Sequence, residues 1–145
     1  MDRIAAVHAR LEQARDLPGV LDAAYDAFEG MLPVIWGQAD RAGGGLAAFV
    51  MSAGPAANGR DSVAGAPSLP PAAAPPGVPL AAGDPAAGVT EDEAAAAVAG
   101  LSQLLASRLA DAAAWAADAA DRAACADAAR HAGAIWSLLA GAPGP

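Results

Sequence analysis

Apolar residues recur at helical spacing near the start of the chain. The positions i, i+3, i+4 and i+7 hold Ile4, Val7, His8 and Leu11. This spacing places them on one face of a helix, which we expect to begin with Asp2 as a cap and to run to about Arg15. The sequence Asp-Leu-Pro-Gly at 16–19 then indicates a turn and a second helix, because proline is favoured in a first helical turn.

The second helix has the clearest amphipathic pattern. One face collects the apolar residues Leu21, Ala24, Tyr25, Phe28, Met31 and Leu32, and the opposite face carries the acids Asp22, Asp26 and Glu29. Proline lacks a backbone donor, so Pro33 is expected to end or kink this helix. A flexible break at the glycines 43–45 and a short third helix over 46–53, stopped by Gly54 and Pro55, are expected to follow.

Proline, glycine and alanine dominate residues 61–89. Such a segment buries too little apolar surface to offset the entropy of ordering its backbone. We interpret it as a long disordered linker between an N-terminal helical half, residues 1–60, and a C-terminal half, residues 90–141.

The C-terminal half opens with Thr90 and Glu93, which match a capping box at a helix start. No Gly or Pro occurs from Leu101 to Ala132, so one long helix is the simplest reading. The apolar stripe argues for a hairpin instead, because Val98, Leu101, Leu104, Leu105, Leu109, Ala112 and Trp115 lie on one face. Cys125, Ile135, Trp136 and Leu139 lie on the other. A break capped by Asp118 or Asp121 resolves the conflict.

These elements predict an all-α fold: a small antiparallel helical bundle of two to three N-terminal helices and an Ala-rich C-terminal hairpin. Each half is too small to bury its own stripe well, so we expect 1–60 and 90–141 to pack as one domain. The linker would pass outside it.

Composition excludes several partners. Sixteen acids face eight arginines, for a net charge of −8. Nucleic acids and anionic membranes are attracted mainly by cationic side chains, so neither is expected as a partner. With one cysteine and no apolar leader at its start, the chain is expected to be cytoplasmic.

Chemistry-bearing residues are few and scattered. His8 and Glu12, like Asp127 and His131, are spaced i, i+4 and could contribute ligands to a metal site between helices. Their places on the polar edges favour solvated helix pairs instead. His131 follows Cys125 by six residues, which puts the two on different faces of a helix, so Cys125 is interpreted as a small buried hydrophobe. No catalytic residue, metal site or cofactor is expected.

Two groups could contact a protein partner. The acidic row Asp22, Asp26 and Glu29 is either a docking surface or the wet face of its helix, and the wet face is favoured. Trp36, Trp115 and Trp136 are either core residues, the favoured reading, or interface anchors, because tryptophan is enriched in interfaces. The candidate partner-binding residues are therefore Asp22, Asp26, Glu29, Trp36 and Trp115.

The function predicted from these features is a non-enzymatic protein–protein interaction or regulatory role. The partner would be another protein, with a homo-oligomer as a further option. The alternative is a bundle that binds a small ligand in an apolar pocket lined by Tyr25, Phe28 and Trp36.

Overall fold

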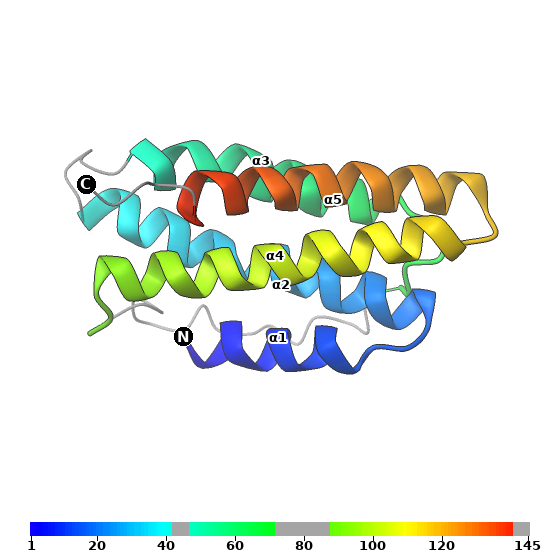
Figure 1. The fold of residues 1–145 in the computed structure, drawn as a ribbon, viewed down its shortest axis with the longest axis horizontal. Helices are drawn as coiled ribbons and strands as arrows, with labels where there is room; N and C mark the ends of the chain where they lie inside the picture. The colour runs from blue at the N-terminus through cyan, green and yellow to red at the C-terminus, as the bar shows by residue number, and fades with distance from the viewer. Residues whose placement is uncertain (42–46, 72–87, 141–145) are drawn as a thin grey trace.

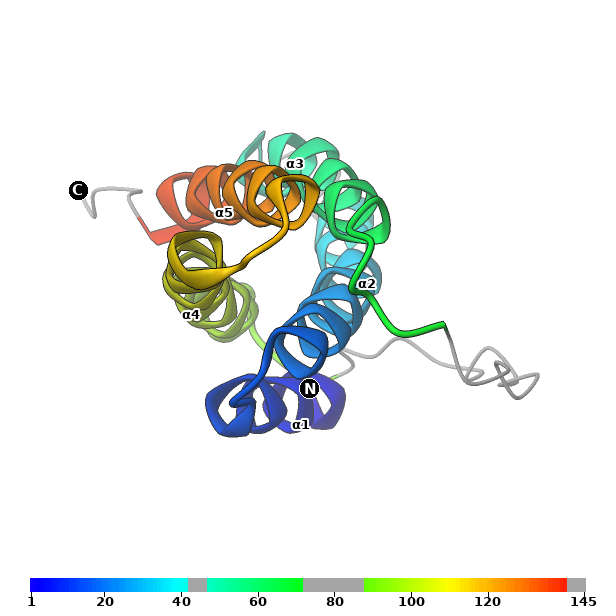
Figure 2. The same ribbon diagram turned by 90° about the vertical axis from the view of Figure 1, so that its right-hand side faces the viewer.

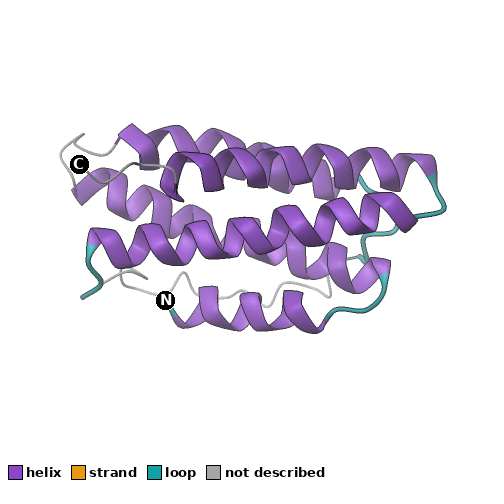
Figure 3. Ribbon diagram, in the orientation of Figure 1, coloured by secondary structure: helices purple, strands orange, loops and turns teal. Residues whose placement is uncertain are grey.

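The computed structural model describes residues 1–41, 47–71 and 88–140, and this part of the chain forms helices without any strand. In chain order they are α1 (Asp2–Gln13), α2 (Leu17–Arg41), α3 (Ala47–Ala64), α4 (Glu91–Trp115) and α5 (Ala119–Ala140) (Figure 3). The prediction of an all-α protein is confirmed. The predicted break at 43–45 and most of the predicted linker lie outside the described residues.

Four helices lie side by side in the cyclic order α2, α3, α5, α4, and each contacts the next (Figure 2). Neighbours in this ring run in opposite directions (Figure 1). Helix α1 packs outside the ring against α2 and α4. As drawn in Figure 1, α2 and α5 finish at the left end, where α3 and α4 begin; we call it the left end below.

The core fills the space between these helices as one cluster. The stripe of α1 is buried as predicted through Ile4, Val7 and Leu11. On α2, Leu21, Phe28 and Met31 are fully buried, whereas Tyr25 and Leu32 are half-buried at the edge of the core. The largest fully buried side chains are Phe28, Phe49, Leu11, Leu21, Met31, Ile35, Leu101, Leu105, Leu109 and Ile135.

Helices α2 and α3 approach closely where Gly59 faces the Phe28 ring. A Cβ built at Gly59 would lie 2.5 Å from Phe28 Cζ and 3.0 Å from Cδ1, well inside van der Waals contact. The absence of a side chain at Gly59 therefore creates the space that the buried phenylalanine occupies.

The prolines within α2 and α3 do not end these helices. Helix α2 continues through Pro33 to Arg41, and α3 continues through Pro55 to Ala64, so the predicted stop of the third helix at Gly54 and Pro55 is wrong. Each proline removes one backbone hydrogen bond. The turns that follow still bury apolar residues, including Ile35 on α2 and Val63 on α3, and this burial favours continuing the helix.

The predicted linker starts too early at residue 61. Residues 61–64 are the last turn of α3, and Leu69 packs against the core. The Ser68 backbone N–H donates to Asp121 Oδ1 at 3.0 Å, and Ser68 Oγ donates to Asp121 Oδ2 at 2.6 Å. Asp121 is 1% exposed, so this buried carboxylate of α5 holds the turn after α3 in place.

The predicted break in the C-terminal half is present between α4 and α5. Asp118 Oδ1 accepts hydrogen bonds from the backbone N–H groups of Ala120 at 2.7 Å and Asp121 at 3.1 Å, which satisfies free donors at the start of α5. Arg122 Nη1 donates back to the Ala116 and Ala117 carbonyls at 3.0 and 2.7 Å. The predicted capping box of Thr90 and Glu93 at the start of α4 is also present.

An arginine from α4 closes the end of α1. Arg108 Nε donates to the Leu11 carbonyl at 3.1 Å, and its Nη2 donates to the Ala14 carbonyl. Carbonyls in the last turn of a helix have no partner within the helix. Arg108 therefore ties α1 to α4 through groups that α1 cannot satisfy alone.

Candidate functional site

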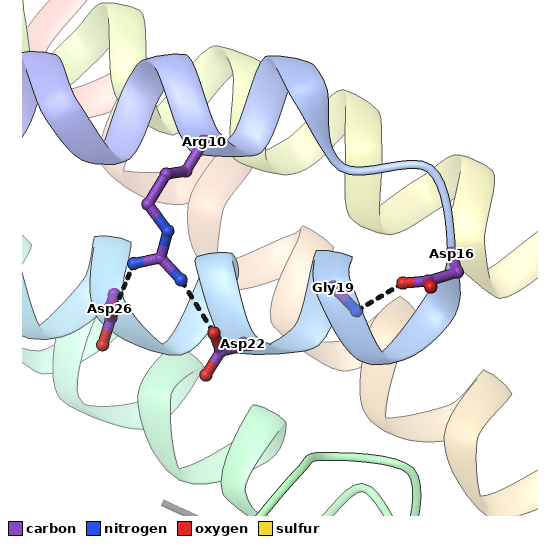
Figure 4. Close-up of polar contacts among 5 residues, drawn as sticks. All are labelled: Arg10, Asp16, Gly19, Asp22 and Asp26. Carbon is purple, nitrogen blue, oxygen red and sulfur yellow. Dashed lines mark hydrogen bonds and ion pairs between the residues drawn. The ribbon is translucent and has the colours of Figure 1, made fainter. Parts of the chain in front are cut away.

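The acidic row on α2 is partly neutralised within the chain. Arg10 of α1 reaches across to α2, where its guanidinium pairs with Asp22 at 2.7 Å and with Asp26 (Figure 4). The hydrogen bond to Asp26 and the field of both carboxylates raise the pKa of Arg10. About half of each side chain is exposed, so the contribution to stability is small. Two of the acids predicted to contact a partner, Asp22 and Asp26, are therefore already paired with Arg10.

The third acid of the row, Glu29, lies near α3. Its Oε1 is 3.7 Å from Arg60 Nη1. Burial, followed by the nearby Glu29, raises the pKa of the Tyr25 hydroxyl on the preceding turn of α2. All three acids of the row therefore have a cationic neighbour on an adjoining helix.

The tryptophans are largely outside the core. The exposed fraction is 52% for Trp36, 50% for Trp115 and 41% for Trp136, so the reading of these residues as core is wrong. Neighbouring residues such as Ile35 on α2 and Ile135 on α5 take the buried positions. The indole next to a buried residue on a helix then points about 100° away from the core direction.

The structure does not bring the two predicted tryptophan anchors together. Trp36 lies near the end of α2 and hence at the left end, whereas Trp115 is the last residue of α4, at the opposite end (Figure 1). Two further exposed apolar side chains, Val50 and Met51, lie in the first turns of α3 and so at the left end. Trp136 is four residues from the end of α5. We call Trp36, Val50, Met51 and Trp136, which lie near this end on three different helices, the apolar end surface.

A groove of about 540 Å³ opens beside this surface, between α3, α4 and α5. It is lined by Ala48, Phe49, Glu91, Asp92, Ala95, Ala96, Ala99, Gly100, Gln103, Trp136, Leu138, Leu139 and Ala140. Sequence reasoning missed this groove, which we call the end groove. The run of small residues near the start of α4, of which Ala96 and Gly100 are exposed, was its one local signal, and only the packing of three helices gives the groove walls.

Asp127 of α5 connects three side chains. Ser62 Oγ of α3 donates to Asp127 Oδ2, Arg130 pairs with Oδ1, and His131 Nε2 lies 3.5 Å from Oδ2. The hydrogen bond from Ser62 is the largest of the causes that lower the pKa of Asp127. The pair Asp127–His131, like His8–Glu12 at 2.8 Å, is thus a local helix pair as expected.

Acid should weaken this contact. A lowered native pKa means that Asp127 stabilises the fold fully above its unfolded pKa, about 3.9. The effect is lost as the pH falls through the native value. Ser62→Ala should therefore lower the urea midpoint at about pH 7 and have a smaller effect at about pH 3. Ser107→Ala, at an exposed position on α4, should give the same small shift at both pH values. A Ser62→Ala effect that grows in acid would contradict this assignment.

No nucleophile or metal centre emerges from the described residues. Cys125 is buried, and burial, with the nearby Asp121, raises the pKa of its thiol, which disfavours the reactive thiolate. Within this part of the chain, His, Cys, Asp and Glu side chains do not gather in groups that could hold a metal ion. None of the described helices has the length and apolar character needed to cross a membrane.

Comparison of the chain with protein-family models, with curated proteins and with solved structures finds no match. The chemistry of the surface itself is therefore the basis for a functional proposal.

Proposed function

We propose that this protein acts as a non-enzymatic, cytoplasmic protein-interaction module, built as a small antiparallel helical bundle with the Pro/Ala/Gly-rich segment as its linker. The observation that carries the proposal is the apolar end surface. Trp36, Val50, Met51 and Trp136 are 52%, 47%, 59% and 41% exposed, and all lie near one end of the molecule. A single exposed apolar residue is common on protein surfaces, whereas four large ones near one end of a small protein favour an interaction site there.

Tryptophan is suited to anchor such a contact, because it buries a large area with few rotatable bonds. Trp36 is therefore the anchor we propose. The other predicted anchor, Trp115, stands apart from this surface and serves as a matched comparison. The acids Asp22, Asp26 and Glu29 already have arginine neighbours, so a partner would have to compete with Arg10 and Arg60 for them.

The alternative ligand pocket has weaker support. Phe28 is fully buried in the core, whereas half of Trp36 is exposed. The two aromatic side chains therefore differ in how far a ligand from solvent could reach them. A thermal-shift screen checks the alternative directly, since a ligand of the folded state raises the melting temperature.

Photo-crosslinking tests the proposal. A photoreactive phenylalanine analogue at position 36 should give a discrete protein adduct in cells that produce the protein, whereas the same analogue at position 115 should not. The double variant Trp36→Ser, Met51→Ser should keep its melting temperature, because both side chains are largely exposed. When the photoreactive analogue is placed at position 50, the protein without these two substitutions should form an adduct, and the double variant should not. Equal labelling at positions 36 and 115 would argue against the proposal.

A further inference from the structure

The end groove has apolar walls and a floor of small residues. Trp136 and the half-buried Leu138 of α5 are the large apolar side chains of its lining that reach solvent, whereas Phe49 and Leu139 in the same lining are buried. Small residues of α4, including Ala96 and Gly100, complete it, and a Cβ added at Gly100 would meet no atom within 4 Å. A groove of this size and lining can accept a few apolar side chains while the backbone of the incoming segment approaches α4 closely.

The charged residues in the described lining of the groove are both acidic. Glu91 and Asp92 are exposed and are the only charged residues in its lining as described. Their side chains make no hydrogen bond or ion pair within the described part of the chain, and the capping box beside them is formed by Thr90 and Glu93. The start of α4 carries about half a positive charge from the helix dipole. This partial positive charge is smaller than the combined negative charge of Glu91 and Asp92, so the rim of the groove stays negative.

We propose that the end groove binds a cationic amphipathic helix of a partner protein. Apolar side chains on one face of that helix would pack against Trp136 and Leu138, and arginine or lysine beside them would pair with Glu91 and Asp92. A second copy of this chain fits less well, because each copy carries a net charge of −8. The inference rests on the proposed interaction function and names a partner class and a site for it.

The probe is a synthetic amphipathic helical peptide with leucine on one face and arginine on the other. A second peptide keeps the leucines and replaces every arginine with glutamate. Fluorescence anisotropy with the full-length protein should show binding of the cationic peptide. The acidic peptide should bind at least about tenfold more weakly. Raising the salt concentration from about 0.05 M to about 0.5 M should reduce the difference in affinity between the two peptides, because salt screens exposed charges.

Three matched pairs of variants locate the contact. Gly100→Leu fills the groove, whereas Gly54→Leu adds the same bulk at an exposed helical glycine on α3 with equally open surroundings. Trp136→Ser removes a wall, whereas Trp115→Ser removes a similarly exposed indole at the other end. Glu91→Gln with Asp92→Asn neutralises the rim, whereas Asp61→Asn with Asp111→Asn changes the net charge equally towards the other end of the bundle. The first of each pair should weaken peptide binding about tenfold, and the second should change it less than twofold.

Other results would overturn the inference. If both variants of each pair weakened peptide binding equally, the cationic peptide would be attracted to the acidic protein as a whole and not to the groove. Equal binding of both peptides would mean an apolar site without charge selection. Dimers in sedimentation that become monomers in Gly100→Leu would assign the groove to a second copy. If the cationic peptide does not bind but photo-crosslinking at position 36 gives an adduct, the groove inference is wrong and the interaction function stands. If both fail, both are wrong.

Discussion

Replacing Phe28 with alanine should lower the free energy of unfolding by about 3–5 kcal/mol. Phe28 is fully buried on α2 and faces α3 at Gly59. The loss combines apolar transfer energy with a cavity that the glycine opposite cannot fill. Urea unfolding of the full-length protein measures this value from the transition midpoint and slope.

The control lies on the same helix. Asp26→Ala removes a partly exposed ion pair with Arg10, and such pairs contribute little, so its effect should stay within about 0.5 kcal/mol. Similar small effects for Phe28→Ala and Asp26→Ala would show that the core face of α2 is misplaced.

Local signals in the sequence predicted several helix starts and faces. Thr90 and Glu93 cap α4, Asp118 caps α5, and Ile4, Val7 and Leu11 form the buried stripe of α1. In each of these features, successive residues are within about four positions of one another. The half-turn shift of the apolar stripe likewise indicated the break between α4 and α5.

Features that depend on distant residues were not predictable in this way. Whether a helix continues past Pro55 depends on the burial of residues after it, such as Val63, and that burial is set by other helices. Ser68 looked like part of a linker because its partner, Asp121, is 53 residues away. Tertiary contacts of this kind override local propensity.

The candidate site shows the same division. The acidic row on α2 was visible from its spacing, but Arg10, which neutralises two of its members, belongs to another helix. Tryptophan was assigned to the core by size, although the helical phase placed Trp36 beside the buried Ile35. The end groove joins Phe49, Gly100 and Trp136 from three helices, and no single stretch of sequence contains its shape.

Gly59→Ala should destabilise the protein by about 1–3 kcal/mol, even though alanine is the better helix former by about 1 kcal/mol. The new Cβ would overlap the Phe28 ring, and a fully buried ring in a packed core can move only by displacing its neighbours. Gly54→Ala, in the same helix and with open space around it, should raise the stability by up to about 1 kcal/mol.

A double-mutant cycle separates steric overlap from other effects of the methyl group. When Phe28 is first replaced with leucine, the overlap is reduced, so Gly59→Ala should become less harmful than in the native background. Urea unfolding of the four proteins gives the coupling energy. If Gly59→Ala proved as benign as Gly54→Ala, the close approach of α2 and α3 at this point would be incorrect. The space for Phe28 would then have to come from another part of the core.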